Sequence, residues 1–249
     1  MTATTAELTI GSIPESSILK AIFENPGKFG ELILKNAERL HKVLPIALPI
    51  DPKTGLLHGS YFENVKLPEY LKKSYEENKN IAYMVYDINN LEEINKNPRY
   101  GKSIGDLVVQ AVAHSLESFF KIHMPDSIIA RIDYGDEFAI ATFGSKCNSA
   151  FGHTYILAED ALRKVPEKAK EYIKHANQIS FEDISLKCGI IDIKPPKLSL
   201  DANDELNNQL IIKNYISAIK DSSERAVQSA RNHTKTIEIG QFAVLPKIF

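Results

Sequence analysis

Two β-rich runs lie only a few residues apart near the middle of the chain. They read "SIIARID" at 127–133 and "EFAIATF" at 137–143, and a short turn that contains a glycine separates them. Because so short a turn joins neighbouring antiparallel strands, the pattern predicts a β-hairpin. Asp136 and Glu137 are adjacent in the sequence at its tip. Within the octet "RIDYGDEF" these two carboxylates are either catalytic or only the polar end of a turn.

Strands and helices alternate around this hairpin. The apolar run "IAYMVYDI" at 81–88 predicts a buried strand, and 103–120 has the apolar spacing of an amphipathic helix. The other predicted elements are a helix at about 153–175, a strand at 184–193, a helix at about 205–231 and a closing β-rich segment at 235–245. This order predicts an α/β fold in which helices flank a central sheet that contains the hairpin.

The start of the chain differs from the rest. After a polar stretch, apolar residues recur at helical spacing until Asn-Pro-Gly at 25–27 interrupts them. We expect two helical pieces here, forming an N-terminal helical extension at 1–45 ahead of a main domain at 46–249.

Composition narrows the partners and the cellular setting. The chain has 30 Lys and Arg against 32 Asp and Glu, so its formal charge of −2 creates no field that would favour nucleic acid or an anionic membrane. Cys147 and Cys188 have neither metal-ligand spacing nor the pattern of a disulfide framework. The first residues lack the regions of a secretory signal, and the apolar stretch at 43–50 is far too short to span a bilayer. We therefore expect a soluble, cytoplasmic protein without a nucleic acid polymer or a membrane as partner.

Acidic side chains stand at the ends of two predicted strands. Asp87 ends the strand at 81–88, while Asp136 and Glu137 precede or begin the strand at 137–143. If the two strands are neighbours, these carboxylates face each other. Such pairs suit Mg²⁺, which is commonly held by one or two carboxylates together with substrate phosphates. The alternative is that each carboxylate is a solvated group at a strand end or turn.

Five separated motifs occur in an order that matches one family. They are Asp51, Thr54, Gly55 and Leu56 followed by Tyr61-Phe62; Asp87-Ile88-Asn89 followed by Asn95; "GKSIGD" at 101–106; "YGDEF" at 134–138; and "AVQSARNHTK" at 226–235. Over about residues 48–245 the chain resembles the GGDEF domain, the nucleotidyl cyclase domain of diguanylate cyclases. The resemblance implies the palm-like fold of this family, with a central mixed β-sheet flanked by helices and a signature β-hairpin.

The resemblance also implies roles for individual residues. Asp87, Asp136 and the carbonyl of Ile88 would hold Mg²⁺ (or Mn²⁺) bridging the phosphates of GTP, and Asp136 and Glu137 would be the catalytic carboxylates. The other implied roles are guanine binding by Asn95 and Asp106, phosphate binding by Arg231 and Lys235, and a signature turn at Tyr134 and Gly135. A carboxylate suits guanine because it accepts hydrogen bonds from the N1 and N2 donors that adenine lacks.

For the whole domain, the resemblance implies an enzyme of bacterial signalling. It would condense two molecules of GTP to cyclic di-GMP with release of pyrophosphate. Each domain of the family holds one GTP, so the resemblance also implies a homodimer for catalysis.

Several of these residues also have a purely structural explanation. Ser103 and Asp106 match a capping box, in which the serine begins a helix and the acidic residue three positions later supports it. Arg231 and Lys235 could serve the dipole at the end of a helix, and Asn95 could satisfy the backbone of a loop.

The chain departs from the family motifs at several positions. Tyr134 replaces the first signature glycine, Asn89 replaces an acidic residue and Glu92 replaces a lysine, while the arginine before the signature is displaced by one position, at Arg131. The product-inhibition motif Arg-x-x-Asp is missing from "HMPDSII" at 123–129. These departures leave open a catalytically degenerate GGDEF module that binds GTP or a cyclic dinucleotide as a regulatory or interaction domain. A third possibility is a cyclase of the same fold that makes another cyclic nucleotide.

Overall fold

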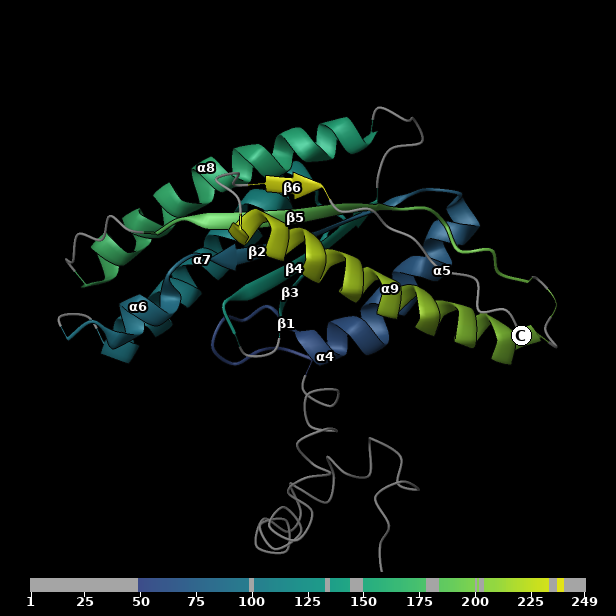
Figure 1. Ribbon diagram of the computed structural model, residues 1–249, viewed down its shortest axis with the longest axis horizontal. Coiled ribbons are helices and arrows are strands. Elements are labelled where there is room, and N and C mark those ends of the chain that lie inside the picture. The colour runs from purple at the N-terminus through teal and green to yellow at the C-terminus, as the bar shows by residue number, and fades with distance from the viewer. Residues whose placement is uncertain are drawn as a thin grey trace, which may run out of the picture. The chain divides into compact units, whose positions relative to one another are not determined.

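The structure is a computed structural model that describes residues 49–98, 101–132, 135–143, 150–177, 184–199, 201, 204–232 and 237–239. The helical extension predicted at 1–45, Tyr134 of the signature turn and Lys235 lie outside the described residues. Within the described part, helices surround a central sheet (Figure 1).

Six strands of the described residues form one mixed sheet in the order β1-β3-β4-β2-β5-β6. Their bounds are β1 (Leu57–His58), β2 (Ile81–Ile88), β3 (Ile128–Ile132), β4 (Glu137–Phe143), β5 (Leu186–Ile193) and β6 (Ile237–Ile239). β2 runs antiparallel to both of its neighbours, β4 and β5, whereas β1 runs parallel to β3 and β6 runs parallel to β5. β3 and β4 pair antiparallel as the predicted hairpin. The predicted α/β fold with a central mixed sheet is therefore confirmed.

Helices cover both faces of this sheet. The helical elements are α4 (Gly59–Tyr61), the π-helical turn η2 (Phe62–Lys66), α5 (Leu67–Glu77), α6 (Leu91–Lys96), α7 (Gly101–His123), α8 (Ala150–Asn177) and α9 (Glu205–Asn232). α7 and α8 contribute to the core on one face, and α5 and α9 contribute to the core on the other, as Figure 1 shows. The three long helices agree with the sequence-based prediction to within a few residues.

β2 is buried along its whole length, as its apolar sequence predicted. Side chains alternate across a strand, so Tyr86 and Ile88 join the core under α7 and α8, while Tyr83 and Val85 join the core under α5 and α9. Asp87 lies two residues after Val85, so its side chain points to the same face of the sheet, the one covered by α5 and α9.

The start of α7 corrects one interpretation of the sequence. The helix begins at Gly101, so Ser103 is its third residue and not the residue that precedes it. Ser103 is therefore not an N-cap, and the capping-box explanation of Asp106 is wrong.

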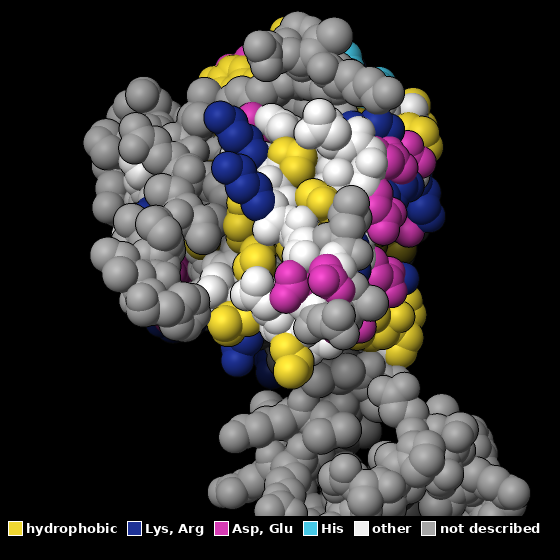
Figure 2. Space-filling model, turned by 90° about the vertical axis from the view of Figure 1, so that its right-hand side faces the viewer, with side chains coloured by type: hydrophobic (Ala, Val, Ile, Leu, Met, Phe, Trp, Pro, Cys, Tyr) yellow, Lys and Arg dark blue, Asp and Glu magenta, His cyan; other side chains and the backbone are white. Residues whose placement is uncertain are grey.

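The surface of the described residues carries charges of both signs. On the face in Figure 2, Lys and Arg side chains and Asp and Glu side chains both occur, and neither kind covers the face. Among the described helices, none combines the length and apolar character that a bilayer crossing requires.

Close packing at Gly189 brings α9 against the sheet. A Cβ atom at this position of β5 would lie 2.8 Å from the backbone nitrogen of Val227 and 2.9 Å from the Cβ of Ala226. Any side chain at 189 would therefore push α9 away from the sheet. Arg231 lies about one turn beyond Val227 on the same helix, so its position depends on this contact.

We predict that Gly189→Ala lowers the free energy of unfolding by about 1–3 kcal/mol, because the added methyl group overpacks the contact with α9. Urea denaturation followed by circular dichroism measures the change. Lys194→Ala, an exposed position just beyond β5, is the control and should stay within about 0.5 kcal/mol of the parent. Equal stability of the Gly189 variant and the parent would contradict the close approach of α9.

Candidate functional site

Asp87 ends the buried strand β2, and its side chain is only 4% exposed. Arg231, in the last turn of α9, donates to both of its carboxylate oxygens, from Nη2 to Oδ1 at 2.5 Å and from Nε to Oδ2 at 3.1 Å. Two parallel hydrogen bonds of this kind hold a guanidinium in a defined orientation. Arg231 therefore lies against Asp87, although the two are 144 positions apart in the sequence.

The hairpin tip joins the same cluster. Glu137 is the cross-strand partner of Asp87, and its Oε1 accepts a hydrogen bond from Nη2 of Arg231 at 2.9 Å. The backbone N–H of Ile88 donates to the carbonyl of Asp136 at 3.2 Å. The expectation that the two acidic ends face each other across adjacent strands is thus confirmed.

The cluster has more negative than positive charge. Asp87 and Glu137 both contact the guanidinium of Arg231. The positive charges of Arg231 and Arg131 both act on Asp136, but Arg131 is also paired with a further carboxylate, that of Asp51. Burial and the nearby Asp87 charge raise the pKa of Asp136 above its ordinary value. Burial also raises the pKa of Glu137, and the Arg231 guanidinium partly offsets this rise. An additional cation would relieve both the repulsion and the desolvation.

The donor set fits a hard divalent cation. Asp87 lies near the end of β2, and Asp136 directly precedes β4, the neighbouring strand, so both carboxylates belong to the same end of the strand pair. Mg²⁺ prefers oxygen ligands and keeps part of its hydration shell. Among the described residues, no group of three or more His, Cys, Asp or Glu side chains is arranged so that it could hold a metal ion, so substrate oxygens or water would have to complete the coordination. Arg231 contacts both oxygens of Asp87 in this structure, so a metal at Asp87 would share these oxygens with the guanidinium or displace it.

A second group of polar side chains lies where α6 meets α7. A Cβ atom on Gly105 would lie 1.9 Å from Oδ1 of Asn95, so the Asn95 side chain lies directly against the backbone of Gly105. The next residue, Asp106, accepts a hydrogen bond from Nζ of Lys53 at 2.6 Å. Asn95 and Asp106 thus both lie near the start of α7, and their binding of guanine stays a prediction. Lys53 is an addition that the sequence analysis did not predict.

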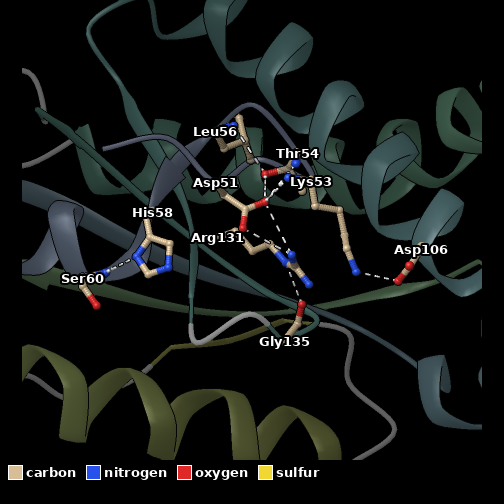
Figure 3. A network of polar contacts seen from close by, with 9 residues as sticks. All are labelled: Asp51, Lys53, Thr54, Leu56, His58, Ser60, Asp106, Arg131 and Gly135. Carbon is tan, nitrogen blue, oxygen red and sulfur yellow. Dashed lines mark hydrogen bonds and ion pairs between the residues drawn. The ribbon is translucent and has the colours of Figure 1, made fainter. Parts of the chain in front are cut away.

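A buried ion pair links the loop at 51–56 to the hairpin (Figure 3). Asp51 accepts hydrogen bonds from the backbone N–H and the hydroxyl of Thr54, at 2.9 and 2.8 Å. Nη1 of Arg131 lies 3.4 Å from Oδ2 of Asp51, and the two side chains are 5% and 2% exposed. Nε of Arg131 donates to the carbonyl of Gly135 at 2.9 Å. This Asp51–Arg131–Gly135 network therefore holds the hairpin tip in place.

Asp51 and Arg131 stand at motif positions, but the sequence predicted no role for either. One signal was available, because Arg131 is a charged residue within the β-rich run at 127–133. A charge at a predicted strand position needs a partner if the strand is buried. Nothing in the local sequence identifies that partner, which is 80 positions away.

A cavity of about 480 Å³ lies beside Arg231 on the α9 side of the sheet. Glu137 and Arg231 line one part of it, and Lys220 lines another part together with Glu63, which it contacts at 2.9 Å. A volume of this size is within the range of ligand pockets. Glu137 and Arg231 are therefore accessible from this cavity, whereas Asp87 and Asp136 are not among its lining residues.

We predict strong coupling between Asp51 and Arg131. Arg131→Met should lower the free energy of unfolding by about 3 kcal/mol, because it leaves the buried Asp51 carboxylate without its guanidinium partner. The double variant with Asp51→Asn should cost less than the sum of the two single changes, which urea denaturation of all four proteins would measure. Lys73→Met removes an exposed partner of Glu77 and is the control. Additive effects of Asp51→Asn and Arg131→Met would contradict the coupling.

Comparison with known proteins identifies the domain. The family model described as "Diguanylate cyclase, GGDEF domain" matches residues 49–208. No curated protein matches the chain. Among solved structures, the coiled coil and GGDEF domain of DgcB from Caulobacter crescentus in complex with c-di-GMP is 15% identical with a TM-score of 0.51, covering 89% of this chain and 98% of that chain.

Two GGDEF-domain structures from Pseudomonas aeruginosa match the chain with similar sequence identity and TM-score. The GGDEF domain of YfiN, also called TpbB, is 20% identical with a TM-score of 0.53, covering 77% of this chain and 94% of that chain. The GGDEF domain of FimX is 17% identical with a TM-score of 0.51, covering 78% of this chain and 99% of that chain. At these identities the likeness concerns the fold, whereas the family model covers more than half of the chain. The chain belongs to the GGDEF domain family of diguanylate cyclases.

Proposed function

We propose that this protein is a diguanylate cyclase, which condenses two molecules of GTP to cyclic di-GMP and releases pyrophosphate. The observation that carries the proposal is the meeting of Asp87 and Glu137 as cross-strand partners beside Asp136. A second support is that Asn95 lies against Gly105, the residue before Asp106, where α6 meets α7. Metal-binding oxygens and base-recognising groups are the two parts that such a reaction needs.

In the proposed reaction, the 3′-hydroxyl of one GTP attacks the α-phosphorus of the other, and pyrophosphate leaves. Asp87, Asp136 and the carbonyl of Ile88 would hold Mg²⁺ or Mn²⁺. The bound ion would neutralise phosphate charge and lower the pKa of the attacking hydroxyl. Glu137 would help to organise this acidic site.

When the nucleotide binds, Arg231 would leave its carboxylate partners and bind the phosphates instead. Its guanidinium now pairs with Asp87 and Glu137, and phosphate oxygens are equally good acceptors for its planar fork. Lys235 lies four positions later in the sequence and would contribute a second positive charge to the phosphates. Movement of Arg231 to the phosphates would also free both oxygens of Asp87 for the metal.

The proposed reaction needs two copies of the chain. Each domain would supply one GTP, so two domains must face each other as a homodimer. We propose that the extension at 1–45 helps to bring them together, in a cytoplasmic bacterial signalling protein.

A second candidate is a GGDEF module that binds GTP or a cyclic dinucleotide without turnover. The observation that favours it is the engagement of Asn89, the residue that replaces an acidic one in the family motif. Its Nδ2 donates to the hydroxyl of Ser185 at 2.8 Å, and its N–H donates to the Ser185 carbonyl at 3.0 Å. Asn89 therefore ties the end of β2 to the segment before β5 and supplies no carboxylate to a metal.

A turnover assay separates the two candidates. The full chain with Mg²⁺ or Mn²⁺ and GTP should form cyclic di-GMP, resolved by chromatography, and Asp136→Asn should lower the rate at least about 100-fold, because it removes a ligand of a catalytic metal. Asp221→Asn makes the same change at an exposed position of α9 and should leave the rate unaltered. GTP binding without product at high protein concentration would favour the second candidate instead.

The raised pKa of Asp136 predicts how its removal changes stability. A carboxyl group whose pKa is higher in the folded than in the unfolded protein destabilises the fold where it is ionised, and this cost disappears as the pH falls through the folded value. In the absence of divalent metal, Asp136→Asn should therefore raise the thermal midpoint at pH 7. The gain should shrink as the pH falls and should vanish only well below about pH 3.9, the unfolded pKa, where the carboxyl group is protonated in both states. A gain that does not vary with pH, or a loss of stability at pH 7, would contradict this prediction.

A further inference from the structure

We propose that Lys53 is a further specificity-determining residue, which reads O6 of guanine while Asp106 reads N1 and N2. The proposal rests on the function proposed above and extends it to a residue of the loop at 51–56. The observation behind it is the contact between Nζ of Lys53 and Oδ1 of Asp106 at 2.6 Å, drawn in Figure 3.

The loop that carries Lys53 is anchored in the protein. The N–H of Lys53 donates to Oδ1 of the buried Asp51 at 3.2 Å, and Asp51 is held in turn by Thr54 and Arg131. The backbone of Lys53 is therefore fixed by the same network that holds the hairpin tip. Its ammonium group is directed across to α7, to a residue 53 positions later in the sequence.

The pair remains accessible to a ligand. The side chains of Lys53 and Asp106 are 31% and 42% exposed, so neither is sealed inside the core. A pair with this exposure contributes little to stability, typically below about 1 kcal/mol. Asn95 borders the same spot through its contact with Gly105.

The chemical groups at this spot complement one base. Asp106 only accepts hydrogen bonds, and Lys53 only donates them, with three N–H groups available. On guanine, the N1 and N2 donors lie next to the O6 acceptor, so Asp106 can take the donors while Lys53 keeps one hydrogen bond to Asp106 and gives another to O6. Because Nζ of Lys53 contacts the Asp106 carboxylate, the two groups lie side by side, as O6 and N1 do on guanine.

Adenine would make two unfavourable contacts at the same place. Its 6-amino group is a donor and would face the ammonium of Lys53, and its N1 is an acceptor and would face the Asp106 carboxylate. Sites that leave polar groups unsatisfied in this way reject the wrong ligand strongly. Lys53 therefore adds a second point of discrimination to the one at Asp106.

Binding of base analogues tests the proposal. The probes are α,β-methylene triphosphates of guanosine, inosine and 6-thioguanosine, which cannot release pyrophosphate; isothermal titration with Mg²⁺ measures their affinity for the full chain. Inosine lacks the N2 amino group but keeps O6, whereas 6-thioguanosine keeps both donors and replaces O6 by a weaker acceptor. Lys53→Met should weaken binding of the guanosine and inosine analogues about 10-fold, which corresponds to about 1.4 kcal/mol.

The decisive measurement is the ratio of the affinities for the guanosine and the 6-thioguanosine analogue, which differ only at position 6 of the base. The parent protein should prefer the guanosine analogue to the 6-thioguanosine analogue, and Lys53→Met should bind the two equally. Lys53→Arg keeps the donors and should retain part of the preference, whereas Asp106→Asn should remove the preference for guanosine over inosine. Lys73→Met, an exposed lysine of α5, is the matched control and should behave like the parent.

The outcomes separate this proposal from the proposed function. If the parent protein binds none of the guanine analogues, the function as a GTP-using domain is wrong and the role of Lys53 is wrong with it. If the parent binds them and Lys53→Met binds the guanosine analogue with the same or higher affinity, only the role of Lys53 is overturned. In that case the lysine merely pairs with, or competes for, the Asp106 carboxylate.

Discussion

The arrangement of the domain depends on β2, a strand that is buried on both faces and hydrogen-bonded on both edges. Such a strand has to be apolar, and it has to have helices on each side to exclude water. Asp87 is the one carboxylate on it, and it lies where the strand ends and the loop begins. β2 therefore places one acidic group, Asp87, near its end, beside the hairpin tip that carries Asp136 and Glu137.

Ion pairs neutralise several of the acidic side chains in and around the site. Three acidic side chains each contact a cation of the same chain: Asp51 with Arg131, Asp87 with Arg231, and Asp106 with Lys53. The first pair is buried and structural. In the second pair Asp87 is buried and Arg231 is partly exposed, whereas both partners of the third pair are partly exposed. The second and third pairs lie at positions proposed to meet nucleotide. In the proposed complex, phosphate would replace Asp87 as the partner of Arg231. Guanine would form hydrogen bonds with both Lys53 and Asp106.

Sequence patterns located most of the elements because the patterns there are long and regular. The buried strand at 81–88, the hairpin and the long helices follow from apolar runs and helical spacing that few other structures satisfy. α5 and α6 were not predicted. α6 is only six residues long, too short for a periodic signal. α5 buries Leu67, Leu71 and Ser74 at helical spacing, so its signal was present in the sequence but was not recognised. The capping box at Ser103 was wrong because α7 starts two residues earlier.

By itself, the sequence determined the fold class, the family and the identity of the acidic motif residues, because these depend on local patterns and on motif order. Only the tertiary structure decided which charges meet. Arg131, Arg231 and Lys53 find carboxylates that are 80, 144 and 53 positions away. Partners at such separations are set by strand register and helix packing, which local sequence does not encode. The pairing of Arg231 with Asp87 and of Lys53 with Asp106 could therefore be found only in the folded domain.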